Sequence, residues 1–236
     1  MIYSSECSTG ASSVNQTQRL YRRRITECRA VIKIGEFDRG GKTRVPTIAL
    51  DHDFTPTTTI TPYGIFLPQY QELYLFFVSS KLTADCIVDL LWLWWSMVKD
   101  RFRDIDKLVL NQDNGPENHS RRTQFLHRIV EFACQSQLQV SLAYYPPYHS
   151  KYNPVERAFG WLEQHWNGSL LDSVETVLRF AENLTFQGQQ PVVRLVEKVY
   201  HTGVKLTQQA MSELEKQVQR FSSLPKWFVD IVGKPT

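Results

Sequence analysis

The segment Leu108–Pro116, with the sequence LVLNQDNGP, decides the fold. Its apolar run ends at Asp113, and the turn residues Asn114, Gly115 and Pro116 follow at once. This pattern predicts a strand that ends in an aspartate. Ligands gather at the carboxyl ends of strands in α/β sheets, so Asp113 is expected to project into such a crevice. Taken alone, however, Asp113 is better explained as an Asx-turn residue that binds its own backbone.

Alternating strands and helices are predicted on both sides of this segment. Upstream, β-branched and aromatic runs predict three strands in an antiparallel meander, and Thr83 is placed as the N-cap of a long helix. Downstream, a helix should bury Phe125, Ile129, Phe132 and Ala133 on one face before another strand. The expected strands are Thr26–Phe37, Val45–Phe54, Glu72–Ser80, Asp106–Asp113 and Gln139–Tyr145, the expected helices are Ala84–Phe102 and Ser120–Gln137, and a loop holds Pro56 and Pro62.

The last third of the chain is predicted to be helical. Asn153 and Pro154 suit the N-cap and first position of a helix. Further helical patterns cover Asp172–Asn183, Val192–Tyr200 and Thr207–Phe221. The expected organisation is a disordered segment (1–24), an α/β domain (25–168) and a helical C-terminal extension packed on it (169–236).

Composition narrows the function only slightly. A net charge of +3 and 42% hydrophobic residues describe an ordinary globular chain that could bind phosphates. The most apolar run, Ile87–Val98, is shorter than the roughly 20 residues that span a bilayer, so no membrane association is expected. The four cysteines show no metal-binding spacing, and the polar N-terminus has no signal-peptide core, which favours a cytoplasmic protein.

A second acid, Glu156, lies in the first turn of the helix that follows Pro146 and Pro147. Alone, it is better explained as an acid that complements the helix dipole. Together, an acid at a strand end and an acid entering a helix can converge on a pair of metal ions. Carboxylate oxygens suit Mg²⁺ or Mn²⁺, and two such ions would support displacement at a phosphodiester.

Two stretches closely resemble DDE transposases of bacterial insertion sequences, and the best match is the group named after insertion sequence Azo-thirteen. They are LNQDNGPENHSRRTQF (Leu110–Phe125) and AYYPPYHSKYNPVERAFGWLEQHWNG (Ala143–Gly168), and the second holds the specific pattern PPxxSKxNxxE. The resemblance covers roughly residues 25 to 232. It also includes KIGEFDRGGKTR, ALDHDF, TPYGIF, LTADCIVD, LTFQGQQP and VYHTGVKL.

The resemblance implies a ribonuclease-H-like mixed sheet in the order β-β-β-α-β-α-β-α. It also implies cleavage of element ends and their transfer into target DNA, with two Mg²⁺ or Mn²⁺ ions held by Asp113, Glu156 and a first acid. The implied partners are double-stranded DNA and further copies of the chain, because transposition joins two element ends. The implied location is the bacterial cytoplasm, at the nucleoid when the protein is on DNA.

The sequence departs from the family pattern at the first acid. A few residues before KIGEF, where an aspartate is expected, the nearest acid is Glu27. The additional methylene adds roughly 1.5 Å, a displacement that metal chemistry tolerates poorly. Glu27 is therefore a weak ligand or a lesion, and Asp51, which shares a strand face with Asp53, is the alternative donor.

The second departure is that nothing before Arg22 resembles the helical DNA-recognition region of complete transposases. Three hypotheses follow: a transposase catalytic domain, a truncated and catalytically impaired relict that keeps the fold and nonspecific DNA binding, and a host nuclease on the same fold. The identity of residue 27 distinguishes the first two.

Several polar residues near the acids are candidates for binding DNA. Their functional roles compete with roles on solvated faces, in loops or in caps. They are Arg121, Arg122, Lys151, His149 and Asn153, with His119 beside them. Five tryptophans, Trp92, Trp94, Trp95, Trp161 and Trp166, are expected to pack in the core rather than to stack on bases.

Overall fold

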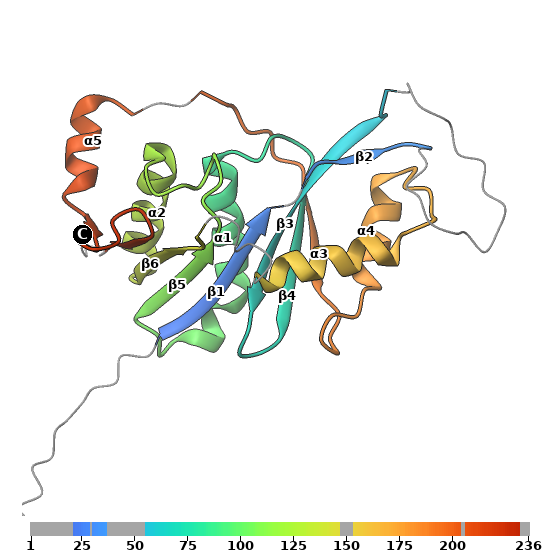
Figure 1. The fold of residues 1–236 in the computed structure, drawn as a ribbon, viewed down its shortest axis with the longest axis horizontal. Coiled ribbons are helices and arrows are strands. Elements are labelled where there is room, and N and C mark those ends of the chain that lie inside the picture. The colour runs from blue at the N-terminus through green and yellow to red at the C-terminus, as the bar shows by residue number, and fades with distance from the viewer. Residues whose placement is uncertain (1–20, 29, 37–54, 147–152, 204–205, 232–236) are drawn as a thin grey trace, which may run out of the picture.

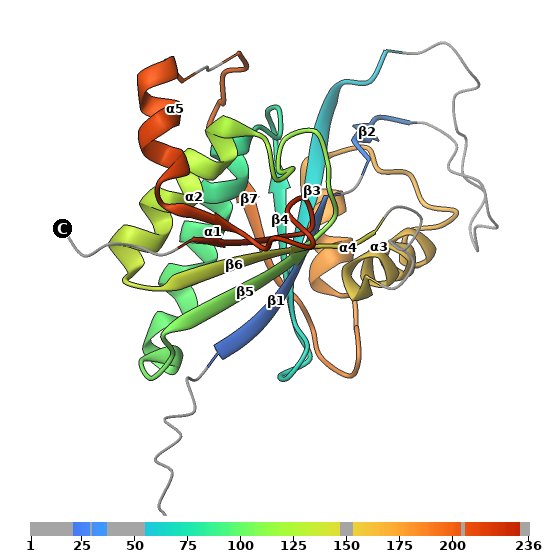
Figure 2. The same cartoon turned by 60° about the vertical axis from the view of Figure 1, so that its left-hand side comes forward.

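A mixed β-sheet runs through the protein, and helices cover both of its faces (Figures 1 and 2). The computed structural model describes residues 21–28, 30–36, 55–146, 153–203 and 206–231, and for residues 21–25, 27 and 28 only the backbone. The strands are β1 (Tyr21–Cys28), β2 (Ile32–Ile34), β3 (Thr58–Leu67), β4 (Glu72–Val78), β5 (Lys107–Gln112), β6 (Gln139–Tyr144), β7 (Val192–Val196), β8 (Val218–Arg220) and β9 (Phe228–Ile231). The helices are α1 (Ala84–Val98), a short 3₁₀ helix (Lys99–Phe102), α2 (Thr123–Ser136), α3 (Pro154–His165), α4 (Val174–Glu182) and α5 (Gln208–Glu215).

The order of the strands in the sheet is β7-β4-β3-β1-β5-β6-β9-β8, and β2 pairs with β3 beside this path. The three neighbouring strands β1, β5 and β6 are parallel, whereas β3 is antiparallel to both β1 and β4. The carboxyl ends of β1, β5 and β6 therefore meet at one edge of the sheet, which we call the carboxyl edge.

Alternation along the strands divides the apolar side chains between two cores. On β4, Tyr74, Phe76 and Val78 belong to the core beneath α1 and α2, whereas Leu75 and Phe77 belong to the core beneath α3 and α4. Side chains of a strand point alternately to opposite faces, so a sheet covered on both sides is apolar on both. This explains why β4 reads as a continuous hydrophobic run.

The helices and strands predicted between Thr83 and Tyr145 are confirmed, whereas the strand predicted over Thr26–Phe37 is divided between β1 and β2. The Thr83 hydroxyl accepts a hydrogen bond from the Cys86 backbone N–H at 3.3 Å and caps α1. The four apolar residues predicted on one face of α2 are all buried, and so are Trp94 and Trp95, while Trp92 packs against the same core. Trp166 is buried as well, but Trp161 is 58% exposed, so its predicted packing is wrong. No helix in the described ranges is long and apolar enough to cross a membrane.

The predicted loop around Pro62 is wrong, because Thr58–Leu67 forms β3. On one side of β3, β2 pairs with Thr58–Ile60 and β1 pairs with Tyr63–Phe66. Pro62 lies between these two paired segments, where its missing N–H breaks no hydrogen bond of those ladders. The strand predicted at Val45–Phe54 lies outside the described residues.

The C-terminal third also differs from its prediction, because it contributes strands as well as helices. In the segment predicted as a helix over Val192–Tyr200, residues Val192–Val196 instead form β7, which pairs in parallel with β4. The helix predicted over Thr207–Phe221 stops at Glu215 and is followed by β8. In both cases the sheet offers an unpaired edge, and pairing overrides a helical pattern that is only local. At the other end of the chain, Tyr21–Arg24, expected to be disordered, begins β1.

Candidate active site at the carboxyl edge

Asp113 is the first residue after β5 and begins a tightly braced loop. The Asn118 side-chain amide donates to the Asp113 carbonyl at 3.2 Å, and the Tyr144 hydroxyl donates to the Asn118 carbonyl at 2.8 Å. A Cβ on Gly115 would lie 3.6 and 3.8 Å from the two Asp113 carboxylate oxygens. The loop backbone thus passes directly beside the carboxylate and fixes its position.

Two further contacts hold the end of this loop. The Ser120 backbone N–H donates to the Asn114 side chain at 3.4 Å, and the Arg220 guanidinium donates to the Ser120 carbonyl at 2.9 Å. Burial raises the pKa of Tyr144 above its ordinary value, so this hydroxyl stays protonated and remains a donor. Sequence reasoning missed Arg220 and Tyr144, because neither is near Asp113 along the chain.

Glu156 lies in the first turn of α3, as predicted. Asn153 is fully buried, and its side-chain oxygen accepts from the Val155 N–H at 3.0 Å, so it caps the helix. An N-cap of this kind fixes where the helix begins. Asn153 therefore sets the height of Glu156 above the sheet, a positioning role that differs from the predicted contact with DNA.

Strand register brings the three acidic positions together. Thr26 on β1 pairs with Gln112 on β5, so Glu27 and Asp113 each lie one residue beyond this pair. Glu27 is also the partner of Gly64 on β3. A Cβ built on Gly64 would lie only 2.5 Å from Val155 Cγ1, so the helix residue next to Glu156 lies directly over the Glu27–Gly64 pair.

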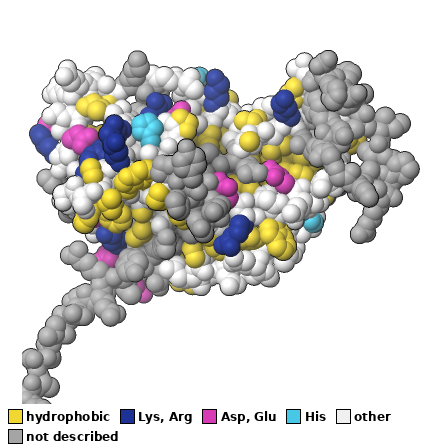
Figure 3. Space-filling model, in the orientation of Figure 1, with side chains coloured by type: hydrophobic (Ala, Val, Ile, Leu, Met, Phe, Trp, Pro, Cys, Tyr) yellow, Lys and Arg dark blue, Asp and Glu magenta, His cyan; other side chains and the backbone are white. Residues whose placement is uncertain are grey.

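Of the other predicted site residues apart from His119, one is exposed, one is paired and the rest lie outside the described ranges. Arg121 is exposed beside the loop, whereas Arg122 donates to Glu117 at 3.0 Å. His149, Lys151, Asp51 and Asp53 lie outside the described residues. On the face shown in Figure 3, Lys and Arg side chains are scattered among acidic and apolar ones and form no continuous basic patch in the part that the structure describes.

The surroundings of His119 favour its neutral form. Its Nδ1 accepts from the Arg121 backbone N–H at 3.2 Å, which requires that nitrogen to be unprotonated. Burial, and after it the neighbouring Arg122 and Arg121, lower the pKa of His119 below 6.5, while Glu117 opposes the shift.

We therefore expect the His119 ring signal, identified by its loss in His119→Gln, to titrate below pH 6.5 in a proton NMR series. The unfolded chain binds this proton more readily, so the contribution of His119 to stability is lost as the pH falls below about 6.5. A signal that titrates above 6.5 would contradict this account of the loop.

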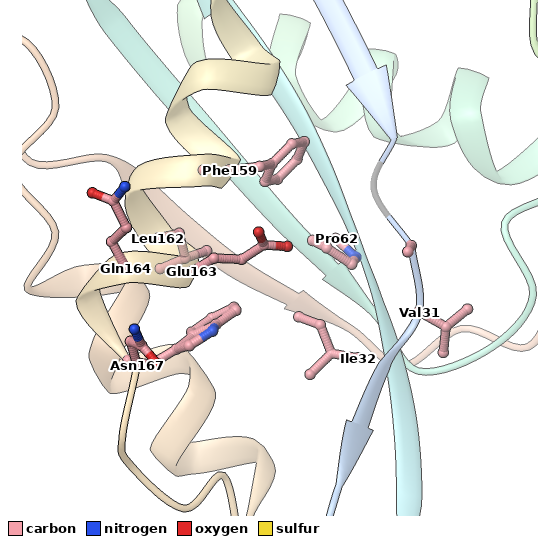
Figure 4. A pocket seen from close by; sticks show the side chains of 11 residues that line it. Val31, Ile32, Pro62, Phe159, Leu162, Glu163, Gln164 and Asn167 are labelled. Atoms are coloured by element: carbon pink, nitrogen blue, oxygen red, sulfur yellow. The ribbon is translucent and has the colours of Figure 1, made fainter. Parts of the chain in front are cut away.

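Two grooves lie beside the acids. The first, which we call the helix groove, has a volume of about 610 Å³ and lies between α3 and the segment Ala30–Ile32. In Figure 4, Glu163 points from α3 across this groove towards Pro62. The second, the loop groove, has a volume of about 640 Å³ and is lined by Gly115–Asn118 and Ser79–Thr83.

Comparison with known proteins agrees with this architecture. The chain is similar to the Mos1 transposase in its paired-end complex with the left transposon end, with a TM-score of 0.50 and 11% identity over 67% of this chain and 46% of that one. For a pre-cleavage Mos1 transpososome the TM-score is 0.47 and the identity 11%, over 70% of this chain and 48% of that one. For the HTLV-2 integrase catalytic core domain in complex with magnesium the TM-score is 0.39 and the identity 15%, over 73% of this chain and 96% of that one. A search of curated proteins gave no match. At such identities the likeness concerns the fold, which is ribonuclease-H-like as expected.

The sequence itself identifies the family. A family model described as "Rhodopirellula transposase DDE domain", which bears the name of the Azo-thirteen insertion sequence, matches residues 12–233. This range contains all three acidic positions of the carboxyl edge and all the described strands and helices. This chain therefore belongs to the DDE transposase family.

Proposed function

We propose that this protein cleaves DNA at the ends of an insertion sequence and transfers them into target DNA, with Asp113, Glu156 and Glu27 as its metal ligands. The observation that carries the proposal is the strand register that sets Glu27 level with Asp113, together with the close approach of Val155, the neighbour of Glu156, to Gly64. Family membership supports it. The chain spans 46% of the Mos1 chain, so the activity of a whole transposase is part of the proposal.

The donors at this edge fit divalent metal. Asp113 and Glu156 offer carboxylate oxygens, the ligands that Mg²⁺ and Mn²⁺ prefer. Among the described side chains, no group of three or more His, Cys, Asp or Glu residues is arranged to hold a metal ion. Glu27, of which only the backbone is described, has the register position for a third carboxylate. When bound by these residues, a pair of ions would activate the attacking oxygen and stabilise the leaving one.

The residues of the chain would then hold the reacting groups in place. Asn118 and Tyr144 fix the loop at Asp113, and Asn153 fixes the start of α3, so the two carboxylates stay at set positions during the displacement. In cleavage, water would attack the phosphorus and the 3′-oxygen would leave with a proton. In transfer, that 3′-hydroxyl would lose its proton and attack a phosphorus of target DNA, and the 3′-oxygen of the target strand would leave with a proton.

We propose that residues 25–168 form the catalytic unit and that residues 169–236 pack on it. The pairing of β7 with β4 and of β9 with β6 supports close packing of the C-terminal part. Double-stranded DNA is the proposed partner, bound near Arg121 and Arg122 and, beyond the described residues, near His149 and Lys151. Because two element ends must meet, we also propose a homo-oligomer on DNA.

A catalytically impaired relict is the second candidate, and the observation that favours it is the glutamate at position 27, where the family pattern has an aspartate.

Purified protein should nick supercoiled DNA with Mg²⁺ or Mn²⁺ and not with EDTA. Glu27→Asp should speed nicking by up to about 10²-fold, because shortening the side chain restores the expected ligand geometry. If the unchanged protein is silent and Glu27→Asp is active, the chain is a relict disabled at one ligand. Silence of both proteins, with DNA binding intact, would contradict the proposed enzyme.

A further inference from the structure

Each groove at the carboxyl edge starts beside one of the acids. The helix groove is lined by Phe159, Gly160 and Glu163, which lie three, four and seven positions after Glu156 on the same side of α3. The loop groove includes Gly115, which lies against the Asp113 carboxylate. Residues that line the two grooves therefore lie close to the proposed site of cleavage.

The linings of the grooves suit nucleotides without their paired partners. The apolar walls of the helix groove include Phe159 and Trp166. Its hydrogen-bonding groups include the Glu163 carboxylate and the Asn167 amide (Figure 4). The loop groove combines Leu82 and Ile87 with hydroxyls, one cation and one acid, among them Thr59, Ser79, Ser80, Lys81 and Glu117. Apolar and aromatic walls pack against the faces of unpaired bases, while hydroxyls and lysine bind sugar and phosphate. Both volumes lie within the roughly 300–1,000 Å³ of pockets that hold small molecules.

Val31 stands between the two grooves and lines both. Its side chain is 56% exposed and, in Figure 4, points away from the helix groove, whereas the neighbouring Ile32 points towards α3. Ile32 and Ile34 are buried, and β2 pairs with β3 through Ile32↔Ile60 and Ile34↔Thr58. Val31 is thus an exposed apolar side chain on a firmly held support.

We propose that Val31 is an apolar wedge that parts the two DNA strands at the cleavage site, one strand entering the helix groove and the other the loop groove. Apolar side chains inserted between base steps unstack DNA in this way. The inference rests on the proposed function, since it takes DNA as the substrate. It adds a residue that acts on the duplex rather than on the metal.

Permanganate oxidation of thymines measures strand opening without any cleavage. We would use a linear 30-base-pair duplex in Ca²⁺, with binding verified by gel shift, and compare the unchanged protein with Val31→Asp. Val199→Asp is the matched control, because Val199 is also an exposed valine, at 68%, and lines neither groove. Thymine oxidation should rise on binding of the unchanged protein and of Val199→Asp, but not of Val31→Asp.

Cleavage in Mn²⁺ gives the second readout. Val31→Asp should cut the paired duplex about tenfold more slowly than the unchanged protein, and it should match that protein on the same duplex with three mismatched pairs. An equal loss on both substrates, or no loss on either, would overturn the wedge. Absence of thymine oxidation in DNA bound to the unchanged protein would also overturn the wedge. Oxidation without cleavage would refute the proposed function and leave the wedge standing.

Discussion

Replacing Asp113 by asparagine is expected to slow metal-dependent DNA cleavage by at least about 10³-fold. A neutral amide keeps the shape of the side chain but removes the negative charge that would hold the metal ions. A loss of this size corresponds to about 4 kcal/mol of transition-state stabilisation, in line with the several kcal/mol that a catalytic metal contributes. Nicking of supercoiled DNA in Mg²⁺ and in Mn²⁺ measures it.

The fold of the Asp113→Asn protein should be preserved. Asn118 donates to the backbone carbonyl of Asp113, and this hydrogen bond survives the substitution. The thermal unfolding midpoint should therefore stay close to that of the unchanged protein. Asp100→Asn is the matched control, because Asp100 is an exposed acid that pairs with Arg103 in the 3₁₀ helix before β5. If Asp113→Asn still nicks DNA at the rate of this control, Asp113 is not a metal ligand.

Replacing Gly64 by alanine should damage both activity and stability, although Gly64 bears no functional group. The new methyl would lie 2.5 Å from Val155 Cγ1 and 3.3 Å from Phe159 Cζ, so α3 must move away from β3. Overpacking of this kind typically costs 1–3 kcal/mol. Because Glu156 follows Val155, a shift of about 1 Å would slow cleavage by roughly 10²-fold.

Gly160→Ala is the control for this substitution on the stability side. A Cβ on Gly160 meets no atom within 4 Å, and the residue lies inside α3. Alanine is a better helix former than glycine, so Gly160→Ala should raise the free energy of unfolding by roughly 0.5–1 kcal/mol. Denaturant unfolding of both variants checks the pair. Equal stability of Gly64→Ala and the unchanged protein would mean that α3 does not pack against Gly64 as closely as described.

The local signals of the sequence predicted the parts of the site that lie close together along the chain. Asp113 at a strand end, the Asn153 cap and the first-turn Glu156 are each encoded within a few residues. The buried face of α2 was likewise predicted, from the helical spacing of its apolar residues. Such features depend on backbone geometry and on capping, which operate over short distances.

Features that depend on distant pairing were not predictable. The need for glycine at residue 64 arises from a helix about 90 positions later in the chain, and Arg220 reaches the Asp113 loop from β8. Residues 192–196 carry a pattern compatible with a helix, but the free edge of β4 selects a strand. Only the three-dimensional neighbour, absent from the local sequence, decides these cases.

The position of β7 and β9 at opposite sides of the sheet has a consequence for synthesis of the protein. β7 covers the outer edge of β4, and β9 covers the outer edge of β6, although both strands come after residue 191. Until residues 192–231 have been translated, β4 and β6 are bare edges that can pair with other nascent chains. A ribosome that stalls or terminates early in this stretch should therefore release an aggregating product rather than a shortened nuclease.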